Sequence, residues 1–168
     1  MLSEAVLGEA AALLALCRVR GLKLAAAESC TGGLVAAVLT SIPGSSDVFE
    51  RGFVTYSNEA KETMLGVPAA LIEREGAVSE AVAKEMAAGA IRNSSASLAV
   101  SITGVAGPGG GTPQKPVGLV WLGAARFGGE VRSERHLFPG DRAAVRAASV
   151  AAALALLAAM AEPLPPSG

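Results

Sequence analysis

The spacing of apolar residues predicts a helix at the start of the chain. Between residues 2 and 20 apolar side chains recur every three or four positions, and Gly21 then offers the left-handed conformation that commonly ends a helix. A short apolar run over 22–27 predicts a buried strand. Residues 33–42 predict a second helix, which stops at Pro43 and Gly44. The chain is therefore expected to begin with a helix, a strand and a helix.

The middle of the chain predicts one strand followed by three helical segments. Residues 52–56 include the β-branched and aromatic types that favour strands, and the polar pair at 57–58 can cap a helix that reaches about residue 65. A short helical turn is expected after Pro68. Ser79 then begins a longer helix over 80–92.

The last third of the chain predicts three strands and a final helix. Gly128 and Gly129 separate the second of these strands from the third, which is a hairpin signal, and Asp141 can cap the helix. The elements are expected at 97–103, 117–127, 131–138 and 141–162, with a Gly- and Pro-rich stretch over 104–116.

This order of elements predicts an α/β fold. Helices alternate with strands until the hairpin, a pattern typical of a mixed, mainly parallel sheet covered by helices on both faces. No internal repeat and no long linker divides the sequence. We therefore expect a single domain over 1–162 and a loose tail over 163–168.

The composition limits the classes of function. The chain has 168 residues, which suits one domain, and it has 14 Lys and Arg against 15 Asp and Glu. A net charge of −1 argues against nucleic acid as a partner. One His and scattered carboxylates predict no metal site and no cofactor. Two Cys are too few for a disulfide framework, so we expect a cytoplasmic protein.

The most apolar segment, 147–161, predicts a helix packed on the sheet. It is mostly Ala and is shorter than the ~20 residues that a membrane-spanning helix needs. The chain also begins without the basic residues of a secretory signal. We therefore expect no membrane partner.

The first candidate for chemistry is the turn at 28–33, Glu-Ser-Cys-Thr-Gly-Gly, between a predicted strand and a predicted helix. Ligands in such sheets gather beyond the carboxyl ends of the strands. Small residues there let the backbone approach a ligand, and free amides at a helix start attract an anion. An ordinary capped turn has the same composition, so both interpretations stay open. The candidate binding residues are Ser29, Thr31, Gly32 and Gly33.

Two further segments are expected at the same edge of the sheet. The stretch from Ser101 to Gly111 is either a loop that wraps a ligand or a plain surface loop. Tyr56, the only Tyr in the chain, precedes Lys61 by five residues, so both side chains can point into one crevice. A Lys held away from water loses its charge more readily, and a neutral amine can accept the proton of a Ser hydroxyl. The alternative is a strand-edge aromatic residue and a solvated Lys.

Three other residues or groups are weaker candidates. We interpret the lone His136 as structural. Cys30 has the position of a nucleophile at a helix start, although buried structural Cys are more common. Arg142 and Arg146 lie one turn apart at a helix start, where the dipole does not favour cations. They are expected to face an anion or another subunit, or to form surface salt bridges.

Taken together, these segments resemble the CinA C-terminal domain family. The similarity covers nearly the whole chain in the family's order, which makes it far more specific than any single motif. It runs through AESCTGG at 27–33, FERGFVTYSNEAK at 49–61, GAVSE at 76–80, SITGVAGP at 101–108, KPVG at 115–118 and GDR at 140–142. Longer members of the family carry an additional nucleotide-processing domain, and we expect its activity to be missing from this chain.

The resemblance implies a three-layer α/β/α fold and a hydrolase. The implied reaction converts nicotinamide mononucleotide to nicotinic acid mononucleotide and ammonia without a metal. The implied Ser-Tyr-Lys apparatus is assigned to Ser46, Tyr56 and Lys61, with Ser29 as the rival nucleophile. We expect the substrate phosphate to lie on the amides of 31–33 with help from Arg142. Thr103 and Gly104 are further candidate binding residues.

Two other function classes stay open at this point. A nucleotide sensor without catalysis would use the same Gly-rich loops, and another Ser hydrolase would act on a different phosphorylated amide. The Ala-rich terminal helices also make self-association into a homo-oligomer plausible.

Overall fold

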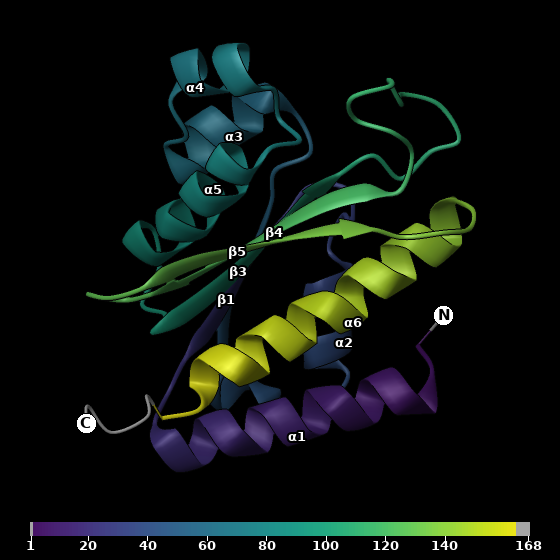
Figure 1. Cartoon of the computed structure of the whole chain (residues 1–168). Helices are drawn as coiled ribbons and strands as arrows, with labels where there is room; N and C mark the ends of the chain where they lie inside the picture. Colours follow the sequence, from purple (N-terminus) through teal and green to yellow (C-terminus); the bar gives the residue numbers. More distant parts are fainter. Residues whose placement is uncertain (1, 164–168) are drawn as a thin grey trace, which may run out of the picture.

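A five-stranded mixed sheet lies between two groups of helices in the computed structural model, which describes residues 2–163 (Figure 1). The predicted tail, 163–168, lies outside the described residues except for its first position. The strands are β1 (Leu24–Glu28), β2 (Phe49–Val54), β3 (Leu98–Gly104), β4 (Leu119–Arg126) and β5 (Val131–Leu137). The α-helices are α1 (Glu4–Arg20), α2 (Leu34–Thr40), α3 (Asn58–Leu65), α4 (Ala69–Glu75), α5 (Glu80–Arg92) and α6 (Arg142–Ala161), and a 3-10 turn, η1, covers Ser45–Asp47.

The strand order is β2-β1-β3-β4-β5. β1 pairs with β2 and β3 in parallel, and the β3–β4 and β4–β5 pairs are antiparallel. Only β4 therefore runs against the others. The mixed sheet is confirmed and four strands share one direction, but the four pairings are divided evenly between the two types. The carboxyl ends of β1, β2, β3 and β5 meet at one edge of the sheet.

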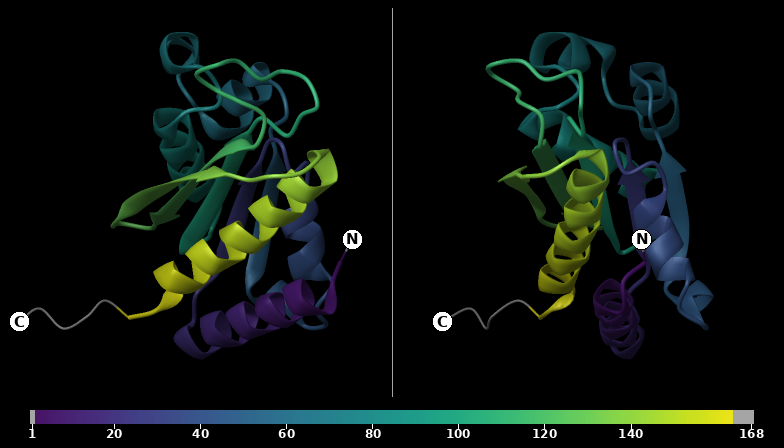
Figure 2. Two further views of the ribbon diagram at one scale, coloured as in Figure 1. Left: turned by 45° about the vertical axis from the view of Figure 1, so that its right-hand side comes forward. Right: turned by 90° about the vertical axis from the view of Figure 1, so that its right-hand side faces the viewer.

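Each face of the sheet is buried against its own helices. α1, α2 and α6 cover one face, and α3, α4 and α5 cover the other (Figures 1 and 2). Along β1, Leu24 and Ala26 pack on the first face whereas Ala25 and Ala27 pack on the second. This alternation follows from the two-residue period of a strand. A central strand buried on both faces explains the unbroken apolar run from which β1 was predicted.

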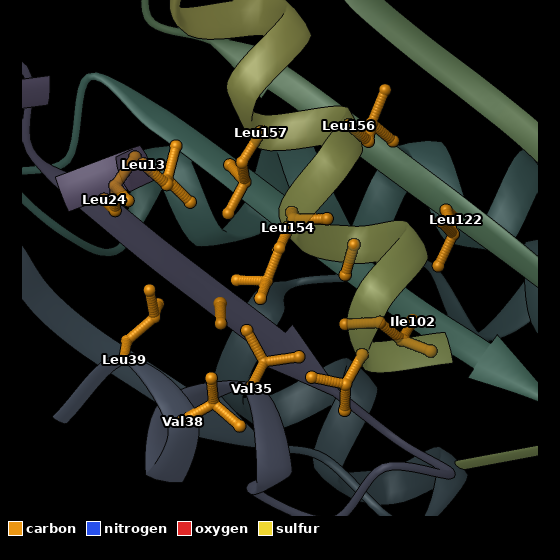
Figure 3. Close-up of a cluster of buried hydrophobic side chains, with 14 of the residues drawn as sticks. Leu13, Leu24, Val35, Val38, Leu39, Ile102, Leu122, Leu154, Leu156 and Leu157 are labelled. Carbon is orange, nitrogen blue, oxygen red and sulfur yellow. The ribbon is translucent and has the colours of Figure 1, made fainter. Parts of the chain in front are cut away.

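α6 is confirmed as a core helix. By length and composition alone, α6 could span a membrane. Its Leu154 and Leu157, however, are buried in the cluster that α6 shares with α1, α2 and the sheet (Figure 3). Small Ala side chains let α6 approach the strands closely. The cytoplasmic location and self-association through α1 and α6 stay predictions.

Most predicted boundaries lie within three residues of the observed ones. Gly21 ends α1 in the left-handed conformation, and Ser57 and Asp141 accept hydrogen bonds from amides in the first turns of α3 and α6. The hairpin at 128–129 is also confirmed. These elements were predictable because each is fixed by a local cap, turn or repeat.

Candidate active site

A hollow of about 200 Å³ opens at the sheet edge where the parallel strands end. Residues at or just after the ends of β1, β2 and β3 line it, as expected for a ligand site in an α/β sheet. Arg142, at the start of α6 near the end of the chain, lines it as well. The hollow is lined by Ser29, Cys30, Tyr56, Asn58, Lys61, Ala77, Val78, Thr103, Gly104, Ala106 and Arg142.

Ser29 is the first residue after β1, and its position is fixed on both sides. Its amide donates to the carbonyl of Ile102 in β3. The preceding side chain, Glu28, is buried and accepts hydrogen bonds from the amides of Val35 and Ala36 at the start of α2, at 2.9 and 3.1 Å. Glu28 thereby links β1 to α2. The turn that carries Ser29 is held by these two bonds and by the bond of its own amide to β3.

Lys61 reaches the same point from α3. The residue is 1% exposed, and its Nζ lies 3.0 Å from the Oγ of Ser29. Nζ also donates to the carbonyls of Thr55 and Ser57, at 2.9 and 3.5 Å. All three partners are uncharged. Burial lowers the pKa of the Lys61 amine from its ordinary value of 10.5, because the charged form loses hydration that these partners only partly replace.

Nζ donates to three oxygens, which is the bonding capacity of an ammonium group. When the amine is neutral, its two N–H groups can keep the two carbonyls and its lone pair can accept the hydroxyl proton of Ser29. A Ser hydroxyl that donates to an amine of lowered pKa is an arrangement for activating a nucleophile. The side-chain geometry therefore suits acyl transfer.

Tyr56 and Arg142 meet at the mouth of the hollow. Tyr56 follows β2 and is 63% exposed, and its hydroxyl oxygen accepts a hydrogen bond from Arg142 at 3.1 Å. Arg142 also donates to the carbonyl of Gly107 in the loop after β3. One guanidinium thus connects three segments that are distant in sequence. The expectation that Tyr56 and Lys61 border one crevice is confirmed.

Arg146 supports the Ser29 turn from α6. Its guanidinium donates to the carbonyls of Cys30 and Thr31 at 3.1 and 3.3 Å. A Cβ added at Gly32 would come within 3.6 Å of this guanidinium, at a backbone φ of +56°. The predicted pair of cations on α6 therefore faces the candidate site.

The structure does not bring Ser46 to Lys61, which corrects our first choice of nucleophile. Ser46 is exposed on η1, before the amino end of β2, and its neighbour Asp47 pairs with Arg18 of α1. Lys61 follows the carboxyl end of β2. A strand therefore separates the two residues, and the hydroxyl in contact with the amine is that of Ser29.

The expected phosphate site on the amides of 31–33 stays a prediction, although several amides nearby already have partners. The amide of Gly32 donates to the carbonyl of Ser29, and the next helix amides, at Val35 and Ala36, are taken by Glu28. The carboxyl group of Glu28 thereby caps the start of α2. Gly32 and Gly33 both adopt the left-handed conformation in this turn. Thr31 is fully buried.

The remaining predicted residues have structural contacts as well. Thr103 is buried and its hydroxyl donates to the carbonyl of Ala77, while Gly104 lies so close to β4 that a Cβ would come 2.7 Å from Val120. Both still line the hollow. His136 pairs with Glu134 and stacks on Phe138, away from the hollow.

Two alternative chemistries find little support. Burial raises the pKa of the Cys30 thiol to about 11, so the thiol is protonated near neutral pH and is a poor nucleophile. Among residues 2–163, no three His, Cys, Asp or Glu side chains gather in a group that would hold a metal ion. The absence of a metal or cofactor from the reaction stays a prediction.

Sequence reasoning missed the roles of Glu28 and Arg146. An acidic residue at the end of an apolar strand, directly before a Gly-rich helix start, is a signal for a buried carboxylate that caps the helix. Arg146 offered no comparable local signal, because its partners lie 115 and 116 positions away.

Comparisons with known proteins agree on one family. The model of the CinA C-terminal domain matches residues 8–161. A CinA-like protein of Akkermansia muciniphila is 58% identical over 125 residues, which are 74% of this chain and 30% of that protein. The nicotinamide-nucleotide amidohydrolase PncC of Escherichia coli K12 is 54% identical over 140 residues, 83% of this chain and 85% of that one.

A solved structure supports the fold directly. The crystal structure of the competence/damage inducible protein CihA from Agrobacterium tumefaciens matches with a TM-score of 0.94 at 43% identity. The match covers 96% of this chain and 99% of that one. The three-layer α/β fold is thereby confirmed.

Proposed function

The chain belongs to the CinA C-terminal domain family, and from that premise we propose that it hydrolyses nicotinamide mononucleotide to nicotinic acid mononucleotide and ammonia. The name of the Escherichia coli relative, of which this chain covers 85%, supports an amidohydrolase acting on a nicotinamide nucleotide. The chain spans only 30% of the Akkermansia muciniphila relative, so the proposal concerns the amidohydrolase reaction alone. The observation that carries the proposal is the buried contact between Ser29 and Lys61.

Ser29 is the nucleophile in this proposal and Lys61 is the general base. The neutral amine accepts the hydroxyl proton as the Oγ of Ser29 forms a bond to the carboxamide carbon. Burial supports this role, since it keeps the amine uncharged at a lower pH than in water. Ser-Lys pairs replace Ser-His pairs in other hydrolases. The single His136 lies outside the hollow, which fits a mechanism without imidazole.

Backbone amides stabilise the charge that develops on the carboxamide oxygen. The amide of Cys30, directly after the nucleophile, is the donor we assign, by the same logic as the strand-to-helix turn of other hydrolases. Arg146 holds the carbonyls of this turn and so fixes the orientation of its peptide groups. Arg146 acts here as a positioning residue.

Collapse of the tetrahedral intermediate breaks the C–N bond and releases ammonia. The leaving nitrogen takes a proton from the hydroxyl of Tyr56, which the ammonium of Lys61 restores through water in the hollow. Arg142 orients that hydroxyl. Water then attacks the acyl ester, Lys61 again takes the proton, and nicotinic acid mononucleotide leaves as Ser29 is regenerated.

A coupled ammonia assay over a small panel of amides tests the function. The panel contains nicotinamide mononucleotide, nicotinamide and another phosphorylated amide. The proposal requires fastest ammonia release from nicotinamide mononucleotide. Tight binding of that nucleotide without ammonia would favour a sensor, and faster release from another amide would favour a different substrate.

A further inference from the structure

Asn58 borders the hollow around Ser29, and we propose that its side-chain amide binds the NH₂ group of the substrate carboxamide and so selects amides for the reaction. The inference rests on the proposed function, because it names the residue that recognises the leaving nitrogen. Asn58 is the first residue of α3, two positions after Tyr56 and three before Lys61. All four residues border the same hollow.

The helix places Asn58 close to the reacting groups. Residues three apart on a helix share one face, so Asn58 lies one turn before Lys61 on the side of α3 that borders the hollow. Helical side chains lean toward the amino end of their helix, which brings the amine of Lys61 back over that turn. The Nζ of Lys61 lies 3.5 Å from the carbonyl oxygen of Ser57 and 3.0 Å from the Oγ of Ser29. The nucleophile and the base therefore meet next to Asn58, the residue after Ser57.

The side-chain amide of Asn58 has its full bonding capacity free for a ligand. The other oxygen- and nitrogen-bearing side chains around the hollow already bond within the protein; they are those of Ser29, Tyr56, Lys61, Thr103 and Arg142. Among residues 2–163, no hydrogen bond includes the exposed side chain of Asn58. An amide offers two N–H donors and an oxygen with two lone pairs. A ligand can therefore use these groups without breaking a contact that stabilises the fold.

An NH₂ group needs an acceptor, and Asn58 supplies one. In the proposed reaction the carboxamide carbon lies at the Oγ of Ser29 and its oxygen at the amide of Cys30, so the NH₂ group lies toward Tyr56, its proton donor. The hydroxyl oxygen of Tyr56 already accepts a hydrogen bond from Arg142. Among the described residues, neither Asp nor Glu borders the hollow. The Oδ1 of Asn58 accepts a hydrogen bond from the NH₂ group before the C–N bond breaks.

The neutral side chain of Asn58 also suits its position beside the base. A carboxylate one turn from Lys61 would favour the charged form of the amine and raise its pKa. The amine would then keep its proton and could not accept that of Ser29. An amide oxygen accepts from the NH₂ group without this effect. Asn58 therefore combines an acceptor for the leaving nitrogen with the absence of a negative charge.

The test compares nicotinamide mononucleotide with the methyl ester of nicotinic acid mononucleotide, which has no N–H at the reacting group. Chromatography measures nicotinic acid mononucleotide, the common product, and gives the ratio of kcat/KM for the amide to that for the ester. Asn58→Ala should lower this ratio by about fivefold or more, the size of one hydrogen bond between neutral groups. Thr63→Ala, at an exposed position of α3 that does not border the hollow, is the matched control and should leave the ratio unchanged.

The ratio separates recognition of the amide from a structural role. Ala is a strong helix former, so Asn58→Ala should keep α3, and its circular dichroism spectrum should match that of the parent chain. A residue that only stabilises the site would affect both substrates alike. An equal loss on the amide and the ester would therefore overturn the inference.

A binding measurement separates this inference from the proposed reaction. In the Ser29→Ala background, which cannot form the acyl enzyme, Asn58→Ala should raise the Kd for nicotinamide mononucleotide by a similar factor and leave the Kd for the ester unchanged. That result, together with no ammonia release by the parent chain, would support the contact and refute the function. Ammonia release by the parent chain, with the ratio and both Kd values unchanged in Asn58→Ala, would overturn the contact alone.

Discussion

The Nζ of Lys61 lies 3.0 Å from the Oγ of Ser29, although 32 positions separate the two residues in sequence. The contact joins the end of β1 to the first turn of α3 and is buried at the base of a hollow. Whether Lys61 can act as a base toward Ser29 depends on the charge of its amine, because only the neutral form can accept the hydroxyl proton.

Ser29→Ala is expected to lower ammonia release by at least about 10³-fold, because it removes the attacking oxygen. Ser46→Ala is the matched control. Since Ser46 is exposed at the opposite edge of the sheet, kcat/KM should stay within about threefold of the parent value. Mass spectrometry should trap an acyl adduct in the parent chain and in Ser46→Ala only. Full activity of Ser29→Ala would remove Ser29 from the mechanism.

The kcat/KM for nicotinamide mononucleotide should rise with pH through the pKa of Lys61 and then level off. The sign follows because the base must be neutral, and burial lowers the pKa at which it becomes so. The inflection is therefore expected below 10.5. A pH–rate profile over the range in which circular dichroism shows the chain to stay folded measures it. A profile without this rise would contradict the role of Lys61 as base.

The same burial makes stability depend on pH. Between the lowered pKa of Lys61 in the folded chain and 10.5 in the unfolded chain, the unfolded state binds more protons, so the free energy of unfolding rises with pH. The rise is about 1.4 kcal/mol for each unit by which the pKa is lowered. The variant Lys61→Met has no amine at this position, so it serves as the reference. Denaturant unfolding of both chains across that window should therefore show a rising difference in favour of the parent, and a constant difference would contradict the lowered pKa.

Cys30→Ala should keep most of the amidase activity. Its thiol, with a pKa of about 11, is protonated near neutral pH, and the group assigned to the reaction at this position is the backbone amide. The parent chain should also resist iodoacetamide at neutral pH while it is folded. Rapid alkylation with loss of activity, together with an inactive Cys30→Ala chain, would instead assign the nucleophile to Cys30.

Glu28→Ala is expected to lower the free energy of unfolding by about 2–3 kcal/mol, because one buried and one partly buried amide at the start of α2 lose their acceptor. Glu73→Ala, at an exposed position on α4, is the control and should change stability by less than about 0.5 kcal/mol. Urea unfolding followed by circular dichroism measures both. Equal stability of the two variants would show that the carboxylate is not needed to hold the Ser29 turn.

Sequence alone was enough to predict the helices and strands, the α/β class, the family and the crevice that Tyr56 and Lys61 border. These followed from local information: helical and strand periods, caps such as Ser57 and Asp141, and motifs contiguous in the chain. A local cap or repeat involves residues within a few positions of one another, so it can be recognised without knowledge of the tertiary structure.

The Ser residue that contacts Lys61 could be identified only from the folded chain. Ser46 is 15 positions from Lys61 and Ser29 is 32, yet the nearer residue in sequence lies at the far edge of the sheet. The order β2-β1-β3 places β1 beside β2, and the parallel direction of these strands brings their carboxyl ends together. Strand order and direction are set by pairing and packing between distant segments. For the same reason, the contacts of Glu28 with α2 and of Arg146 with the Ser29 turn emerged only from the folded chain.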